Sequence, residues 1–183
     1  KEAREAELLD RYQFIQKYKK ESRQFGAQRR ANEGRAAEIA LRNLSVNAGF
    51  SDVTRLILRM ETKLVEQAEE YFSYKPLEEI ELVISVDETG KSALLCRKDG
   101  KQLKSIPAKY KKNETVKSYQ QTVKKLKEQY SRTKQMMEQA MEDKTPFEVW
   151  EFLQLYKKPV VRPNVESLAV IPVARPESSL GFL

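Results

Sequence analysis

The sequence predicts an α+β fold that is mainly helical. Three patterns predict it: apolar residues recur at helical spacing over 3–74 and 114–143, they alternate with polar residues over 80–86, and Asp99-Gly100 is a strong two-residue hairpin signal. We therefore expect, in chain order, a helical hairpin, a small three-stranded antiparallel meander, a long heptad-patterned helix and a short capped helix. With 40% apolar and 33% charged residues, the chain can form a core beneath a densely charged surface.

Residues 1–76 are expected to form a helical, solenoid-like segment. Apolar spacing predicts three helices, at 3–25, about 30–47 and 51–74. Gly49 suits a left-handed turn, and Ser51 can cap the third helix. A second apolar stripe on the first helix, Phe14, Tyr18 and Phe25, predicts that this helix contacts two neighbours. The residues expected to face inward are Leu8, Leu9, Tyr12, Ile15, Ala36, Ile39, Ala40, Leu44, Val53, Leu56, Ile57, Met60, Leu64, Ala68, Tyr71 and Phe72.

Residues 77–112 are expected to form the antiparallel meander, after Pro76 closes the helical segment. Its strands are predicted at 80–86, 92–97 and 102–106. The turns are Glu88-Thr89-Gly90-Lys91 and Asp99-Gly100. Three short strands are too few to be stable alone, so the meander must pack on helices or on a sheet outside this chain.

Residues 113–160 are expected to hold a long helix and a short one. The long helix, 114–143, carries a heptad stripe, which predicts a long antiparallel partner helix in the same protein, with self-association as the alternative. The stripe consists of Val116, Tyr119, Val123, Leu126, Tyr130, Thr133, Met137 and Ala140. Thr145-Pro146-Phe147-Glu148 predicts a capped start for the short helix, which Pro159 ends. Its apolar residues are Val149, Trp150, Leu153 and Tyr156.

Residues 161–183 form a tail with one apolar run, Leu168-Ala169-Val170-Ile171-Pro172-Val173. We interpret this run as the first strand of a following domain or as an arm over the meander. The chain does not begin with Met, and we expect it to be part of a longer protein. No stretch approaches the run of about 18 apolar residues that a membrane span needs. With no secretion signal and no possible intrachain disulfide, the sequence favours the cytoplasm.

The residue types present argue against an enzyme. The chain has no histidine, which excludes Ser-His-Asp and Cys-His arrangements, histidine-based zinc sites and a histidine base. Cys96, the single cysteine, is expected to be a small buried apolar residue. There is no phosphate-binding glycine loop and no calcium loop. We therefore predict no catalytic residue, no cofactor and no metal ligand. An enzymatic role would need groups from outside this chain.

Positive charge is concentrated in residues 97–127, while the whole chain carries a net charge of +7. This segment predicts a candidate basic surface for phosphates or an acidic partner. The alternative without a ligand is a face that keeps the protein in solution, or one that pairs with acidic groups on the rest of the protein. The basic surface is defined as Arg97, Lys98, Lys101, Lys104, Lys109, Lys111, Lys112, Lys124, Lys125 and Lys127.

Three stretches of the sequence resemble a bacterial domain of unknown function. They are AEIALRNLSVNAGFSDVTRLILRME at 37–61, KDGKQLKSIP at 98–107, and residues 116–161. The domain occurs in large proteins that often carry a WGR domain, some of them labelled molybdate metabolism regulators (MolR-like). The resemblance implies a bacterial, cytoplasmic protein several times longer, with helical-repeat regions alongside and a link to nucleic acid by association. It transfers no functional residue, since no WGR motif occurs in this chain.

The function predicted from the sequence is therefore a non-catalytic structural or interaction module of a larger bacterial cytoplasmic protein. Its expected partners are other domains of that protein. The alternative is binding of nucleic acid, or of an acidic partner, through the basic surface. That alternative predicts steep salt dependence, because neutralising phosphates releases counterions.

Overall fold

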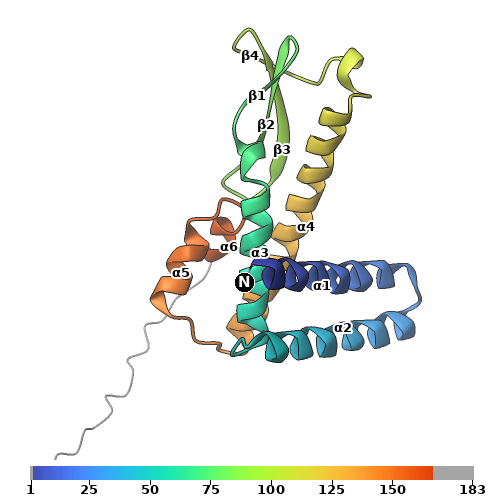
Figure 1. Cartoon of the computed structure of the whole chain (residues 1–183), viewed down its shortest axis with the longest axis vertical. Helices are drawn as coiled ribbons and strands as arrows, with labels where there is room; N and C mark the ends of the chain where they lie inside the picture. Colours follow the sequence, from blue (N-terminus) through green and yellow to red (C-terminus); the bar gives the residue numbers. More distant parts are fainter. Residues whose placement is uncertain (1, 167–183) are drawn as a thin grey trace, which may run out of the picture.

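A computed structural model describes residues 2–166. It is mainly helical, with one antiparallel sheet, so the predicted α+β class is confirmed. Figure 1 shows the sheet at one end of the molecule and the long helix α4 (Glu114–Glu142) running from the sheet to the other end. At that other end, the α1–α2 hairpin and the α5–α6 pair lie on opposite sides of α3. No helix within residues 2–166 has the length and apolar character to span a membrane.

Three helices build the first segment. They are α1 (Glu2–Glu21), α2 (Ala27–Ala48) and α3 (Val53–Gln67), with short 3-10 turns at Ser22–Gln24 and Glu69–Phe72. Gly49 adopts the predicted left-handed conformation, with φ of 82°. The predicted cap of the third helix was wrong by one residue. Asp52 is the N-cap, because its carboxylate accepts the Arg55 backbone N–H at 2.9 Å.

The inward face of α1 is confirmed, because Leu9 and Tyr12 are buried against α2 and α3. Its second stripe is only partly in contact with a neighbour: Phe14 is 70% exposed and Tyr18 is 37% exposed, whereas the Phe25 ring lies 3.5 Å from the guanidinium of Arg29 in α2. The face of α2 was predicted only in part. Its buried residues are Ala37, Leu41 and Ser45, and the predicted Leu44 packs against the same core, whereas Ala36 and Ile39 are exposed.

The sheet has four antiparallel strands in the order β1-β2-β3-β4, one more than predicted. They are β1 (Lys75–Leu77), β2 (Ile80–Val86), β3 (Ser92–Lys98) and β4 (Lys101–Leu103). Pro76 lies just after the end of the helical segment, in edge strand β1, where its missing N–H is tolerated. The Asp99-Gly100 turn is confirmed by positive φ at both residues, 50° and 75°.

The heptad stripe of α4 is buried, but a single long helix does not cover it. Its first half packs on the sheet, in a core that joins Val116, Tyr119 and Leu126 to the inner face of β2 and β3. Its second half packs on α3 and α6, and Met137 is buried there. The expected long antiparallel partner is thus replaced by a sheet and two shorter helices. The meander is stabilised within the chain, as its small size required.

Two short helices follow α4: α5 (Val149–Tyr156) and α6 (Arg162–Glu166). The capped start of α5 lies later than predicted, because Glu148 is the N-cap and its backbone N–H donates to the Glu151 carboxylate at 2.8 Å. The four apolar residues named for this helix from the sequence are exposed. Phe152 and Leu155 pack inward, in contact with residues of α3, α4 and α6. The predicted role of residues 168–173 lies outside the described residues.

Candidate interaction surfaces

The ten cations of the predicted basic surface do not all share one environment. Arg97 forms two hydrogen bonds with Glu81, its partner on the adjacent strand β2, at 2.6 Å and 3.0 Å. Its guanidinium also lies 3.6 Å from the centre of the Tyr74 ring. The hydrogen bond from Arg97 lowers the pKa of Glu81. Arg97 is thus held in the sheet and neutralised.

Two lysines of the basic surface share one carboxylate. Lys98 donates to Glu79 at 2.7 Å, and Lys109 donates to the same side chain at 3.2 Å. These hydrogen bonds lower the pKa of Glu79. Together with Arg97, three of the ten cations therefore meet acidic groups of β2 or of the loop before it.

The other seven cations are exposed and have no carboxylate partner within residues 2–166. These are Lys101, Lys104, Lys111, Lys112, Lys124, Lys125 and Lys127. They lie on three elements: β4 with the loop after it, the turn before α4, and the first half of α4. They are the part of the basic surface that remains available to a ligand.

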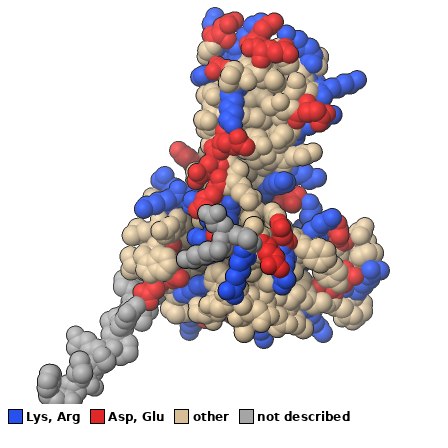
Figure 2. Space-filling view, in the orientation of Figure 1, with Lys and Arg blue, Asp and Glu red and all other residues tan. Residues whose placement is uncertain are grey.

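These seven lysines do not form one flat face. Successive helix positions are about 100° apart, so Lys124 and Lys127 lie about 60° apart on α4, whereas Lys125 lies about 160° from Lys127. Figure 2 shows acidic groups among the basic ones at the end of the molecule that holds the sheet. The arrangement fits several separate phosphate or carboxylate contacts better than one continuous cationic groove.

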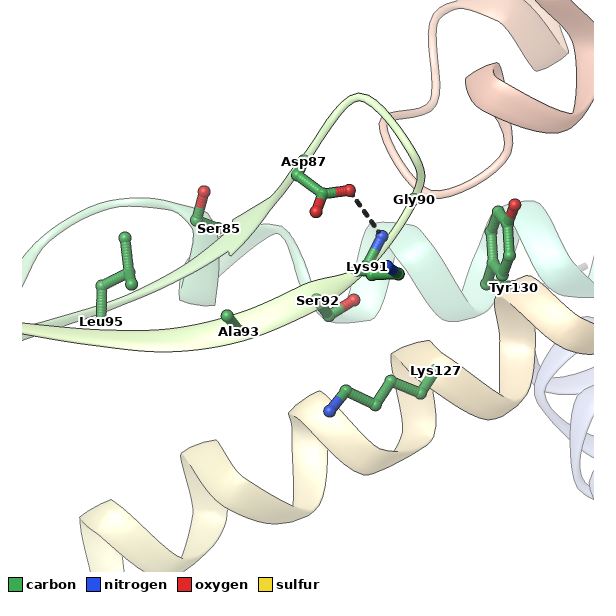
Figure 3. Close-up of a pocket in the computed structure, with 9 residues that line it drawn as sticks. All are labelled: Ser85, Asp87, Gly90, Lys91, Ser92, Ala93, Leu95, Lys127 and Tyr130. Carbon is green, nitrogen blue, oxygen red and sulfur yellow. Dashed lines mark hydrogen bonds between the residues drawn. The ribbon is translucent and has the colours of Figure 1, made fainter. Parts of the chain in front are cut away.

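Lys127 also lines a cavity of about 460 Å³ between the β2–β3 turn and α4. Figure 3 shows Lys127 and Tyr130 on the helix side, facing the turn that holds Asp87, Gly90 and Lys91. Asp87 organises that turn, because its carboxylate accepts the backbone N–H of Lys91 at 3.0 Å. It also accepts the backbone N–H and the hydroxyl of Thr89, and these hydrogen bonds lower its pKa.

Few charged groups line the cavity. It brings together two lysine ammonium groups and one carboxylate that is already hydrogen bonded. Ser92 lines it, but its hydroxyl is buried, makes no hydrogen bond in the described structure and is closed to solvent.

A buried polar cluster was missed by sequence reasoning. Glu61 of α3 is 1% exposed; it accepts the Tyr12 hydroxyl at 2.6 Å and the guanidinium of Arg132 at 2.7 Å. Burial, and then the charge of Glu61, raises the pKa of Tyr12 well above its ordinary value. One signal was present in the sequence: Glu61 immediately follows Met60, in the middle of an apolar stripe. The cluster links three helices, so we assign it a structural role.

Cys96 is buried in β3, as expected, and burial raises the pKa of its thiol, which disfavours the reactive thiolate. Within residues 2–166, no cluster of three or more His, Cys, Asp or Glu side chains could hold a metal ion.

Exposed apolar side chains gather on the outward side of α5. Val149 is 76% exposed, Trp150 64%, Leu153 54% and Tyr156 39%. Their spacing places them within about 120° of one another around the helix. Their neighbours Phe152 and Leu155 fix the opposite side of α5 to the protein. We call these four residues the α5 face.

A second group of exposed apolar side chains lies on the α1–α2 hairpin. It comprises Phe14 and Tyr18 on α1, and Ile39 and Val46 on α2, which are 61% and 69% exposed. Phe14 follows buried Tyr12 by two residues, and Ile39 follows buried Ala37 by two, so each lies about 160° around its helix from a buried neighbour. Each helix of the hairpin therefore carries apolar residues on its buried side and also on the side away from it. We call the four exposed residues the outer hairpin face.

Two family models match parts of the chain. Residues 1–60 match a family of unknown function (DUF5724), and residues 100–178 match a domain of unknown function (DUF4132). Neither description mentions a WGR domain or molybdate metabolism. No curated protein and no solved structure matches the chain. The similarity to domains of unknown function is thereby confirmed. One match covers α1, α2 and half of α3, and the other runs from the start of β4 through α5 and α6 to residue 178.

Proposed function

We propose that the chain is a non-catalytic structural and interaction module of a larger bacterial cytoplasmic protein. The observation that carries this proposal is the outer hairpin face. Isolated exposed apolar residues are normal on protein surfaces, but a group on one supersecondary unit is typical of a contact site. A helical hairpin with apolar residues on both sides is suited to stacking between two neighbours, as in helical solenoids.

The proposed partner of the outer hairpin face is a neighbouring helical segment of the same protein. Phe14 and Tyr18 are four residues apart on α1, so they are adjacent on the helix surface. Ile39 and Val46 are two turns apart on α2. Such spacings fit the ridges and grooves of another helix. The resemblance to a domain of large WGR-containing, MolR-like proteins supports this reading, because helical-repeat regions accompany that domain.

Phe14→Ser and Ile39→Ser, measured in two contexts, test the proposal. In the 183-residue chain both side chains are exposed, so each change should alter the free energy of unfolding by less than about 0.5 kcal/mol. In the intact protein, where the face would be covered, each should cost about 2 kcal/mol or more. Urea unfolding monitored by circular dichroism gives both values.

Met141→Ser is the matched control, because Met141 is 55% exposed on α4 and lies outside the outer hairpin face. It should be near neutral in both contexts. Equal, small effects of Phe14→Ser and Ile39→Ser in the chain and in the intact protein would refute the proposed contact.

A second function, binding of nucleic acid or an acidic partner, is favoured by the seven lysines that have no carboxylate partner among residues 2–166. Its test is the anisotropy of labelled DNA and RNA across a salt series. Binding that weakens steeply with salt supports it, since each neutralised phosphate releases counterions. Lys101, Lys104, Lys111 and Lys112, all changed to Glu, should then abolish binding. Changing Lys17, Lys134, Lys144 and Lys157 to Glu alters the net charge equally and should weaken binding much less.

A further inference from the structure

We propose that the α5 face is the docking site for the apolar run Leu168–Val173 of the same chain. The inference is independent of the outer hairpin face and of any partner from outside the chain. Its starting point is that one short helix exposes four large apolar side chains, one of them Trp150, the chain's single tryptophan. Tryptophan and tyrosine are enriched at the centres of contact sites, where a large ring excludes water.

The described chain ends beside this face. Arg162 of α6 donates to the Tyr156 hydroxyl at 3.3 Å, and its guanidinium lies 4.8 Å from the centre of that ring. The last described residue, Glu166, accepts a hydrogen bond from Arg162 at 2.8 Å. Residue 166 is therefore tied, through Arg162, to the Tyr156 end of the α5 face.

The sequence that follows supplies an occupant of matching character and sufficient length. One residue, Ser167, separates Glu166 from six consecutive apolar residues, LAVIPV. The α5 face is about 10 Å long, from Tyr156 to Val149, at 1.5 Å per residue. A six-residue segment can span up to about 20 Å, which is about twice the length of the face.

Contacts on the other side of α5 hold the helix, and with it the α5 face, in place on the protein. Phe152 and Leu155 anchor the opposite side of the helix among residues of α3, α4 and α6. Arg55 of α3 also forms two hydrogen bonds with Glu151, at 3.1 Å and 3.0 Å. The match to one domain of unknown function extends from residue 100 to residue 178, so the α5 face and the apolar run belong to the same matched region.

Trp150 reports on the contact, because its fluorescence is the only tryptophan signal of the chain. In the 183-residue chain, docking predicts a blue-shifted emission and weak quenching by acrylamide. The double substitution Val170→Asp with Ile171→Asp should move the emission to longer wavelength and raise the quenching constant. Circular dichroism should show unchanged helix content, because the substitutions lie outside the described helices.

The matched control is Ser178→Asp with Ser179→Asp, which adds the same charge outside the apolar run and should leave the Trp150 signal unchanged. If Val170→Asp with Ile171→Asp leaves both emission and quenching unchanged, the proposal is overturned. If the wild-type signal shifts on dilution, a second copy of the chain covers the face and the proposal is likewise overturned. Neither outcome bears on the outer hairpin face, which is measured by other variants.

Discussion

Arg132 of α4 and Glu61 of α3 form an ion pair with two hydrogen bonds, from Nε to Oε1 at 2.7 Å and from Nη2 to Oε2 at 3.1 Å. Oε1 also accepts the hydroxyl of Tyr12 from α1. Gln129 donates to the backbone carbonyl of Glu61 at 2.6 Å. One buried residue thus joins the α1–α2 hairpin to the long helix that supports the sheet.

Glu61→Ala should be strongly destabilising. It leaves the Arg132 guanidinium and the Tyr12 hydroxyl without their acceptor in the protein interior, and removing one partner of a buried pair costs about 3–5 kcal/mol. Urea unfolding measures the loss. Glu7→Ala is the control, because Glu7 pairs with Arg11 on the exposed side of α1. It should cost less than about 1 kcal/mol. Similar losses for the two variants would contradict the structural role of Glu61.

Tyr12 makes stability fall at alkaline pH. Burial raises its pKa in the folded chain well above the value of about 10 that it has when unfolded. The unfolded state therefore releases the proton first, so this contribution to stability is complete below about pH 10 and is lost as the pH rises further. Tyr12→Phe should make the fall in urea midpoint above about pH 10 shallower. Tyr18→Phe, at an exposed position on the same helix, should leave that fall unchanged.

Arg55 connects the start of α3 to the start of α5. It donates to Asp52 at 2.8 Å, to both oxygens of Glu151, and to the backbone carbonyl of Pro146. Arg55→Ala should loosen α5, with a loss of about 1.5–3 kcal/mol typical of hydrogen bonds to charged groups. Hydrogen exchange of the amides in 149–156 should accelerate. Arg59→Ala, one turn later, removes a more exposed pair with Glu5 and should leave those amides unchanged.

Position 90 requires glycine for two reasons: its backbone is in the left-handed region, and the Tyr130 ring lies close to it. Its φ is 78°, and an added Cβ would lie 2.3 Å from Cε2 of Tyr130. Gly90→Ala should therefore cost about 2–4 kcal/mol, from the left-handed backbone and from overpacking. Gly100→Ala separates the two effects, because φ there is 75° but the space is open. It should cost only about 1–2 kcal/mol. Equal losses of unfolding free energy at both glycines would show that the Tyr130 side chain can move aside at no energetic cost.

The longer helices and the strands β2 and β3 were predictable, because helix and strand periodicity depend on local spacing, whereas the short elements β1 and α6 were not predicted. The contacts of each face were not. The heptad stripe of α4 shows that one side is buried, but a stripe covered by a sheet and a stripe covered by a helix have the same period. On α2, few large apolar residues occur, so two phases fit the sequence almost equally well. The tertiary contacts selected Ala37 and Leu41 over Ala36 and Ile39.

The basic surface was likewise predictable only in part. Its composition was visible in the sequence, but the ion pairs that neutralise part of it depend on strand register. The pair between Glu81 and Arg97 could have been found by counting outward from the β2–β3 turn, since the two residues are direct partners across it. Glu79, shared by Lys98 and Lys109, could not, because its contacts come from a loop whose path the pattern does not determine.

The edges of the sheet limit how the molecule can associate. Both edge strands, β1 and β4, are only three residues long. Pro76 removes one N–H from the β1 edge, and Lys75 and Lys101 add charge at the two edges. Short, charged or proline-containing edges are poor templates for another strand. Addition of a partner strand to the sheet is therefore disfavoured at either edge, and with it the ordered aggregation that open β-edges promote.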